Sequence, residues 1–353
     1  MTIDWTKGMV QTYEYYRVDP NTWKDADRIN GIESCVINRD KSNETLGSAT
    51  IDCDFKMDEC YIREYLVAVQ NGKTYKVPLG THLAQTPAVK FDGKRHKYSM
   101  DAYTPLIEMK EVPPPIGYSL LKGQPILELA SNLCRENLRA PVIYTKSTDT
   151  LYADFVSNLN DTWLTFISDL ILNAKHELDI DEMGRVMFAP VQDVASLSHV
   201  WTYDDDNSSI LYPDISDERD LYGIPNVVEV VYSTDSEFLY SRVENKDVNS
   251  PISIQNRGRE IVYRDSNPSI VGKPDKTYID NYATQLLRDL SCLEHKITYR
   301  HGYCPVRIGD CVLLNYKRSG LANVKAKVIS QSIKCETGCP VEETAVYTTK
   351  LWR

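Results

Sequence analysis

Residues 176–184, HELDIDEMG, bring a histidine and several acids together at close spacing. Asp179, Asp181 and Glu182 follow a histidine there, and Gly184 ends the group. Alternating acids before a glycine are typical of the beginning of a calcium loop, in which carboxylate oxygens surround the ion. The full loop needs a later glutamate, but RVMFAPVQD follows Gly184 and has none at that position. A tight hairpin turn therefore explains these acids better than a metal site.

Cys304, Cys311, Cys335 and Cys339 are the candidate metal ligands. The first two are seven positions apart and the last two are four apart, and His301 precedes Cys304 by three. Four thiolates from adjacent strands could hold zinc or an iron–sulfur cluster. The spacing matches neither C-x-x-C knuckles nor ferredoxin runs, and a cysteine within a strand can simply be a small apolar side chain. A disulfide such as Cys335–Cys339 is the other alternative.

Two further acidic stretches, YDDDNSS (203–209) and DISDERD (214–220), could supply paired carboxylates. In a glycoside or peptidoglycan hydrolase, Asp204 and Glu218 would divide the acid and base roles. Runs of Asp, Asn and Ser more often form loops, because their side chains bond nearby backbone groups. The sequence contains no G-x-S-x-G, H-E-x-x-H or G-x-x-x-x-G-K-[ST] motif. We therefore expect no enzyme, no catalytic residue and no resident cofactor.

The charge and composition exclude other classes of protein. A net charge of −10 argues against a protein that grips nucleic acid by its phosphates, and the basic run GKRHK (93–97) is typical of an exposed hairpin. The 23 Tyr against 6 Phe suit broad β surfaces and subunit interfaces. No apolar run approaches the ~18 residues of a membrane span, and no secretory signal is visible. We expect no integral membrane segment and synthesis in a host cytoplasm.

The amino-terminal residues 1–112 are predicted to be β. Short alternating runs separated by Asn-Gly and Asp-Gly indicate antiparallel hairpins. The predicted strands are residues 34–39, 48–55, 60–69, 74–84 and 97–106. Three prolines at 113–115 then disfavour any sheet interior and mark a boundary between domains.

A helical period follows these prolines, and β patterns return after residue 195. Helices are predicted over 123–138 and from Asp161, as the N-cap, to about Lys175. His176 would then lie exposed at that helix end, where the dipole favours a partly positive imidazole. A hairpin around DEMG completes the segment. After residue 195 the predicted elements are strands over 226–233, 296–301, 310–316, 324–334 and 344–352, with a helix over 278–294. The fold class is therefore α+β, mainly β.

Four stretches resemble phage tail hub proteins, which form the ring at the distal end of a tail tube. They are residues 161–190, DTWLTFISDLILNAKHELDIDEMGRVMFAP; 222–233, YGIPNVVEVVYS; 304–316, CPVRIGDCVLLNY; and 77–109, with VPLGTHLAQ before a hairpin and KYSMDAYTPLIEM after it. Two features depart from that family. The cysteine content is higher, and no lytic or spike domain follows, so cell-wall cleavage would belong to another protein.

The resemblance implies three regions: a first tube-like β-barrel domain (1–112), an α/β insert (116–195) and a second barrel with one long helix (196–353). It also implies a homotrimeric ring in the virion, at the distal tail or baseplate. The ring would join the sixfold tail tube to the threefold tip and enclose the channel for DNA and the tape-measure protein. The implied partners are a distal tail or tube protein, a tip, spike or fibre protein, and DNA that passes without sequence-specific binding. A tail-associated cell-wall hydrolase or a carbohydrate- or receptor-binding tail module is the alternative.

Overall fold

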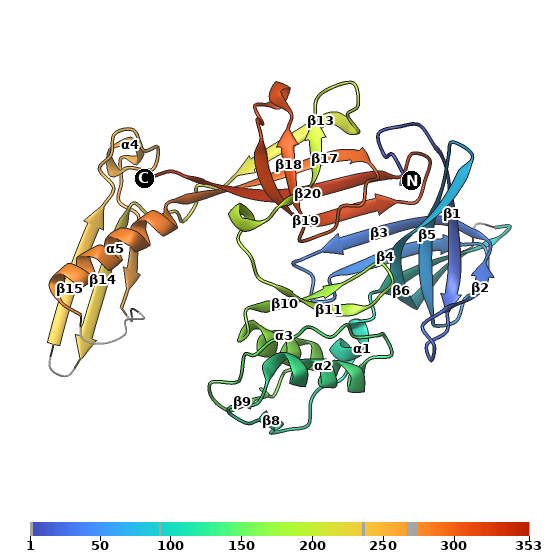
Figure 1. Cartoon of the computed structure of the whole chain (residues 1–353), viewed down its shortest axis with the longest axis horizontal. Helices are drawn as coiled ribbons and strands as arrows, with labels where there is room; N and C mark the ends of the chain where they lie inside the picture. Colours follow the sequence, from blue (N-terminus) through green and yellow to red (C-terminus); the bar gives the residue numbers. More distant parts are fainter. Residues whose placement is uncertain (1–2, 92, 235–236, 267, 269–273, 353) are drawn as a thin grey trace. The chain divides into compact units, whose positions relative to one another are not determined.

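Alternating apolar and polar residues make strands the main regular structure of the described chain, and the predicted α+β, mainly β class is confirmed (Figure 1). The computed structural model describes residues 3–91, 93–234, 237–266, 268 and 274–352. The strands are β1 (Val10–Val18), β2 (Asp25–Ile29), β3 (Ile32–Asp40), β4 (Gly47–Cys53), β5 (Cys60–Gln70), β6 (Lys73–Phe91), β7 (His96–Tyr103), β8 (Ser119–Leu120), β9 (Phe155–Val156), β10 (His176–Ile180), β11 (Val186–Pro190), β12 (His199–Asp204), β13 (Leu211–Arg219), β14 (Val227–Thr234), β15 (Glu237–Glu244), β16 (Val262–Asp265), β17 (Cys292–Gly302), β18 (Cys311–Asn315), β19 (Val324–Lys334) and β20 (Pro340–Lys350). The helices are α1 (Ile107–Glu111), α2 (Ile126–Asn137), α3 (Trp163–Leu172), α4 (Ile254–Arg257) and α5 (Lys276–Leu290), with short 3-10 turns η1 (Val194–Ser196) and η2 (Lys317–Ser319).

One large sheet connects strands from both ends of the sequence. Its order is β13-β17-β20-β19-β3-β4-β7-β6-β5-β1-β2, with β18 paired to β19 and β12 paired in parallel to β18. The antiparallel β19–β3 pair joins the two parts of the sequence that were predicted as separate barrels. Over the described residues the hydrogen-bonded order is an open path, so closure of each part into a barrel stays a prediction.

The chain divides into two compact units. The first holds residues 1–215 and 298–345, and the second holds residues 216–297 and 346–353. The division falls within β13, β17 and β20. The three predicted regions 1–112, 116–195 and 196–353 follow the family resemblance and remain a prediction.

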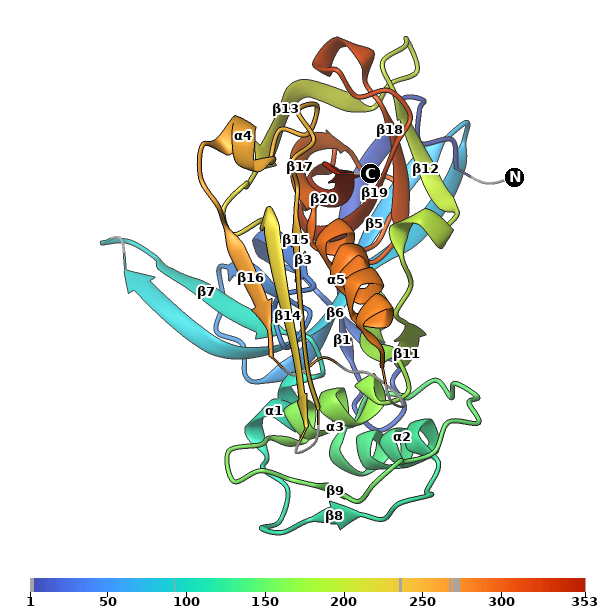
Figure 2. The same ribbon diagram turned by 90° about the vertical axis from the view of Figure 1, so that its left-hand side faces the viewer.

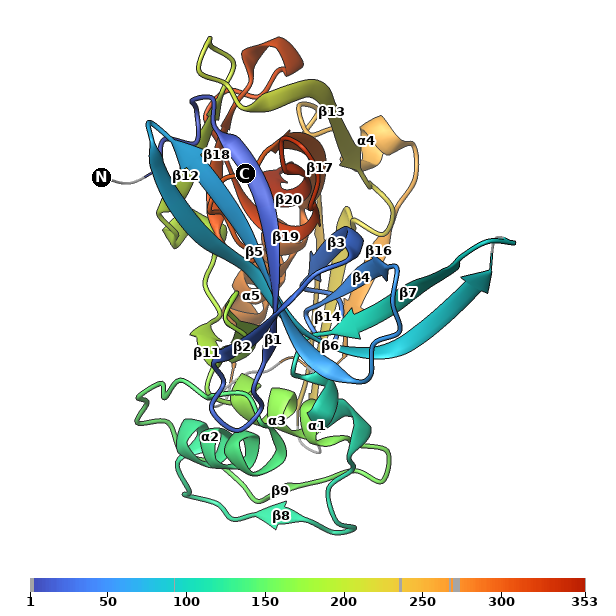
Figure 3. The ribbon, with the colours of Figure 1, turned by 90° about the vertical axis from the view of Figure 1, so that its right-hand side faces the viewer.

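One apolar core cluster of the first unit lies between strands from both ends of the sequence. Inward residues of β4 alternate with outward ones, so Ala49, Ile51 and Cys53 are buried. Ile333 of β19 and Val341 of β20 belong to the same apolar cluster. Figure 3 shows β6 and β7 extending from the sheet as a long hairpin. The first unit therefore depends on late strands for its core.

Helices α1, α2 and α3 gather beside the β10–β11 hairpin (Figure 1). Helix α2 begins after Pro125, as the sequence indicates. Helix α3 buries Phe166 and Ile167, but its N-cap is Thr162, whose hydroxyl accepts the backbone N–H of Thr165. The predicted Asp161 cap was wrong by one position, since threonine serves as well there. Asp161 instead accepts the backbone N–H of Asn158.

His176 is half-buried and opens β10, which corrects its predicted exposed position at a helix end. Helix α3 ends at Leu172, and the Nδ1 of His176 lies 2.6 Å from the carbonyl oxygen of Ala174. The chain turns at Lys175, whose φ is +53°, and so starts the strand earlier than the helical pattern predicted.

In the second unit, α5 covers one face of the sheet β15-β14-β16 (Figure 2). Val228 and Val230 of β14 pack with Ile279, Ala283 and Leu287 of the helix. None of the helices in the described ranges is both long and apolar enough to cross a membrane.

Candidate functional site

The predicted turn between β10 and β11 is present. The two strands pair antiparallel, and the backbone N–H of Gly184 donates to the carbonyl oxygen of Asp181 at 2.9 Å. Gly184 has a φ of +73°, which glycine adopts without strain. The Asp181 carboxylate accepts the backbone N–H of Arg185 at 2.8 Å and pairs with its guanidinium at 2.6 Å. Asp181 is therefore a turn residue, as predicted.

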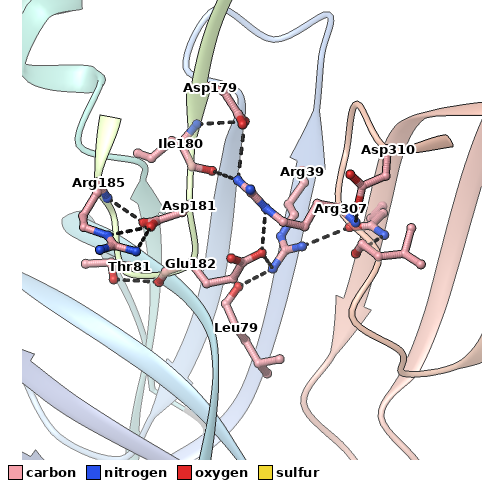
Figure 4. A network of polar contacts seen from close by, with 12 residues as sticks. Arg39, Leu79, Thr81, Asp179, Ile180, Asp181, Glu182, Arg185, Arg307 and Asp310 are labelled. Atoms are coloured by element: carbon pink, nitrogen blue, oxygen red, sulfur yellow. Dashed lines mark hydrogen bonds and ion pairs between the residues drawn. The ribbon is translucent and has the colours of Figure 1, made fainter. Parts of the chain in front are cut away.

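Glu182 points from the same turn onto the large sheet (Figure 4). Its Oε1 lies 3.0 Å from Nε of Arg307 and 3.3 Å from Nη2 of Arg39. Arg307 also donates to the carbonyl oxygen of Ile180 at 2.6 Å. Burial opposes the charge of Arg307, but the carboxylates of Glu182 and Asp179 outweigh it and raise the pKa of the guanidinium. The carboxylate of Glu182 thus pairs with two arginines, Arg39 on β3 and Arg307 in the segment before β18.

Side chains of the large sheet and its loops also bond the backbone of the turn between β10 and β11. The carbonyl oxygen of Met183 accepts the indole N–H of Trp23 at 2.7 Å and a guanidinium N–H of Arg63 at 3.1 Å. Thr81 donates to the carbonyl oxygen of Glu182 at 3.0 Å. A Cβ on Gly184 would lie only 2.9 Å from Cβ of Thr81. We call Arg39, Thr81, Glu182, Met183 and Arg307 the hairpin anchor, because they fix the hairpin to the sheet.

A small cavity lies beside the hairpin anchor. Its volume is about 30 Å³, and its lining includes Leu79, His82 and Ile308 besides the two arginines. That volume holds about two water molecules. The anchor is thus built for packing and does not have room for a substrate.

A second polar group lies deeper in the first unit, around Glu343 of β20. Its carboxylate accepts hydrogen bonds from the hydroxyl groups of Tyr203, at 3.3 Å, and Tyr299. The amide of Gln331 donates to the other oxygen at 2.6 Å. Together with His301, these side chains form what we call the Glu343 cluster. All five are at most 3% exposed, so the carboxylate is buried but well bonded.

His301 carries an altered pKa in this cluster. Its Nδ1 lies 2.7 Å from the carbonyl oxygen of Gly302, and its Nε2 lies 3.1 Å from the hydroxyl oxygen of Tyr203. Burial lowers the pKa of His301, but contacts with Cys304 and Glu343 outweigh burial and raise it to about 10. The protonated imidazole of His301 and the buried carboxylate of Glu343 therefore form a structural ion pair.

Gln331 connects the Glu343 cluster to the hairpin anchor. Its side-chain oxygen accepts a hydrogen bond from Nη1 of Arg39 at 3.1 Å, while its amide bonds Glu343 and the carbonyl oxygen of Val306. The chain of contacts therefore runs from Glu182 through Arg39 and Gln331 to Glu343. Sequence reasoning missed this path. The signal was Glu343 itself, which shares the inward face of its strand with Val341 and Ala345.

The four candidate metal ligands do not form one group. Cys304 contacts the Glu343 cluster, with Sγ 3.3 Å from the Tyr203 hydroxyl, and Cys311 is buried on β18. Cys335 and Cys339 flank the turn between β19 and β20. All nine cysteines are free thiols, so no Cys335–Cys339 disulfide is present. Within the described ranges, no three His, Cys, Asp or Glu residues are placed to hold a metal ion, and zinc or an iron–sulfur cluster remains only a prediction.

The predicted hydrolase pair is likewise not assembled into a described site. Asp204 belongs to the first unit, where its carboxylate accepts a hydrogen bond from the amide of Asn315 at 2.7 Å. Glu218 is an exposed residue of β13 in the second unit. Of the other acids in the stretch 203–209, Asp205 pairs with Arg318 at 3.3 Å, and Asp206 makes a local turn contact with the backbone N–H of Ser208.

The second unit contains an acid, an imidazole and a hydroxyl in contact. Nδ1 of His295 lies 3.1 Å from Oδ1 of Asp217, and Nε2 lies 3.0 Å from the hydroxyl oxygen of Thr349. The order is that of a hydrolytic triad. The three residues stand on the neighbouring strands β13, β17 and β20, and the ring of Tyr347 stacks on the imidazole at 4.4 Å. Ordinary cross-strand pairing accounts for this arrangement.

Comparison with known proteins identifies the fold. No protein-family model and no curated protein sequence matches the chain. The crystal structure of a tail protein from Neisseria meningitidis MC58 superposes with a TM-score of 0.60 at 12% identity, over 95% of this chain and 97% of that one. The 43 kDa tail protein of prophage MuSo2 from Shewanella oneidensis gives 0.64 at 11% identity, over 95% and 98%. The chain has the fold of phage tail proteins.

This tail-protein fold confirms the resemblance that the sequence suggested. A chain of the Francisella PdpA–VgrG complex also matches, with a TM-score of 0.53 at 10% identity, over 98% of this chain and 58% of that one. The fold therefore recurs inside a larger protein as well as in tail proteins of about this length.

Proposed function

We propose that this chain is a structural hub protein at the distal end of a phage tail. The observation that carries the proposal is the match to two tail proteins over nearly the whole of both chains. A shared fold alone does not decide function, but here it agrees with the motifs in four separate stretches of the sequence. The proposed location is the virion, at the distal tail or baseplate.

The proposed assembly is a homotrimeric ring. Two tube-like parts in each of three subunits would present six similar faces to a sixfold tube and three to the tip. A ring interface is heterologous and closes by rotation. Among the described residues, β2 and β13 end the hydrogen-bonded order of the large sheet, so their outer edges suit pairing between subunits. Exposed tyrosines such as Tyr152 and Tyr222, at 90% and 92%, suit contacts with partners.

The proposed channel carries DNA and the tape-measure protein. A net charge of −10 favours a bore that repels a polyanion and lets it pass. The remaining proposed partners are a distal tail or tube protein above and a tip, spike or fibre protein below.

The proposed role does not include catalysis. The acids that first suggested chemistry are used in the turn and in the hairpin anchor, and the Glu343 cluster is closed to solvent. Zymography on bacterial cell walls tests this part. Clearing that is lost in both Asp204→Asn and Glu218→Gln would replace the structural hub by a hydrolase.

The assembly is tested by mass photometry and negative-stain microscopy of the full chain, alone and with a tail-tube protein of the same phage. We expect three-subunit rings, at the latest when the tube protein is present. Immunogold labelling of whole particles should place the chain at the distal tail end. Monomers under both conditions, or label elsewhere on the particle, would overturn the proposal.

A further inference from the structure

Two thiols lie opposite each other where the first and last parts of the sheet meet. The register of β3 and β19 pairs Ile37 with Ile333 and Val36 with Lys334. The next pair along the two strands is Cys35 with Cys335. The backbone N–H of Cys335 donates to the carbonyl oxygen of Cys35 at 2.9 Å, which extends the ladder by one more pair.

The pairing of these strands brings the two thiols near the geometry that a disulfide needs. Directly opposed residues of an antiparallel pair project to the same face, and a hydrogen-bonded pair has its Cα atoms about 5.5 Å apart. Disulfides most often join Cα atoms about 5.5–6 Å apart. Cys35 belongs to the apolar cluster that Ile37 and Ile333 share, and Cys335 is partly buried and packs against that cluster. The two thiols are already in contact. Opposed strand residues have Cβ atoms about 4.5–5.5 Å apart and a disulfide needs about 3.5–4.5 Å, so closing the bond requires a local shift of the backbone at the end of β19.

The two thiols differ in their access to a reagent. Cys35 is 2% exposed, whereas Cys335 is half-buried at the end of β19. Contact with the Cys335 thiol and burial raise the pKa of Cys35 well above its ordinary value. A small reagent must therefore meet Cys335 first, and Cys35 can react afterwards with a neighbour that is already in contact.

A third thiol, that of Cys339, lies in the same apolar cluster as Cys35 but is less suited to form a disulfide with Cys335. It is fully buried, and burial raises its pKa to about 12. It is only four positions from Cys335, so a bond between them would close a short loop and constrain little of the unfolded chain. A bond between Cys35 and Cys335 would instead join parts of the chain 300 positions apart (335 − 35).

We propose that Cys35 and Cys335 form an oxidation site, at which a small-molecule disulfide converts the two thiols into a cross-strand disulfide. The Cys335 thiolate attacks one sulfur of the reagent, whose S–S bond breaks and releases one thiolate, which takes up the proton from Cys335. The Cys35 sulfur, after losing its proton, attacks the Cys335 sulfur and releases the second thiol. Two protein thiols thus lose two electrons and two protons, and the reagent disulfide becomes two thiols.

The cross-link would fix the strand pair on which the first unit depends. The β19–β3 pair is the connection between the amino-terminal strands and the late strands in the sheet order. A covalent bond beside it would keep the two parts together in the unfolded chain and so favour refolding. The expected consequence is a higher Tm for the oxidised protein, by about 5 °C or more for a chain of this size.

The experiment uses the full chain, reduced and then equilibrated with oxidised glutathione. Free thiols are alkylated, and the protein is digested without reduction for mass spectrometry. We expect one cross-linked peptide pair that contains Cys35 and Cys335, a fall from nine titratable thiols to seven, and the rise in Tm. Nine remaining thiols, or a cross-link between Cys335 and Cys339, would overturn the proposal.

Matched serine variants give the control. Cys35→Ser and Cys335→Ser should each keep all eight remaining thiols and show no rise in Tm on oxidation. Cys339→Ser and Cys311→Ser should still lose two thiols. The peptide map is made on the unaltered chain, so it tests the Cys35–Cys335 bond even if one of the serine variants fails to fold.

Discussion

At the residue scale, two adjacent acids of one turn have different roles. Asp181 bonds Arg185 within the turn, whereas Glu182 bonds Arg39 and Arg307 on the large sheet. The sequence indicated the turn, because Asp181 and Gly184 are only three positions apart and their types favour a turn by themselves. It did not indicate the anchor, since both arginines lie far along the chain and only the tertiary fold brings them to Glu182.

Glu182→Gln should therefore destabilise the protein more than Asp181→Asn. Removing the shared charge leaves the guanidiniums of Arg39 and Arg307, with side chains 12% and 27% exposed, without their common counter-ion. We expect a loss of about 2 kcal/mol, below the figure for fully buried pairs because water reaches these groups. Asp181→Asn keeps the turn acceptor and should cost less than about 1 kcal/mol. Urea unfolding measures both, and equal effects would contradict the assigned roles.

The raised pKa of His301 predicts a loss of stability at mildly alkaline pH. The folded pKa of about 10 exceeds the ordinary value of 6.5, so the folded state binds the proton more tightly. This stabilisation is complete below pH 6.5 and falls as the pH rises towards 10. Between pH 6.5 and 7.5, where few cysteines ionise in the unfolded chain, we expect a loss of about 1 kcal/mol. Denaturation series should show a flatter profile for His301→Gln; an unchanged slope would refute the assignment.

At the element scale, the sequence predicted where strands and helices occur better than it predicted the residues at which they end. The strand VKAKVISQSIK at 324–334 was predicted with its observed bounds, because its alternation is regular. The helix predicted over 278–294 ends at Leu290, and β17 takes over at Cys292. Residues 292–294 fit the helical spacing, but they pair as part of β17 with β13 and β20 instead. The local sequence could not indicate this, because both partner strands lie far along the chain.

Helix α3 provides a matched pair of substitutions on one element. Phe166 is 1% exposed and packs its ring against Tyr118, Phe155 and Trp163, whereas Leu172 of the same helix is 55% exposed. Phe166→Asp should prevent folding, because it buries an unpaired charge. Leu172→Asp should shift stability by less than about 1 kcal/mol. Soluble yield and circular dichroism distinguish the two, and a folded Phe166→Asp protein would contradict the packing described for α3.

At the scale of the whole molecule, the first and last parts of the sequence share one core. The sequence suggested an amino-terminal domain over 1–112, because hairpin signals are local and end at the prolines. The structure adds Tyr303, Ile333 and Val341 to the core of that region and pairs β3 with β19. Such contacts cross most of the chain and leave no signal in any short window of sequence.

A fragment of residues 1–112 should therefore not fold by itself. Without β19 and β20 it would expose the apolar face around Ile37 and Ile51, both fully buried in the whole chain, and β3 would keep β4 but lose β19 as a partner strand. We expect rapid proteolysis, binding of a hydrophobic dye and no cooperative thermal transition. Co-expression with residues 196–353 should restore protection, because that piece carries the missing strands. A cooperative transition of the isolated fragment would instead show that the amino-terminal strands form an independent domain and that the β3–β19 pair only joins two finished structures.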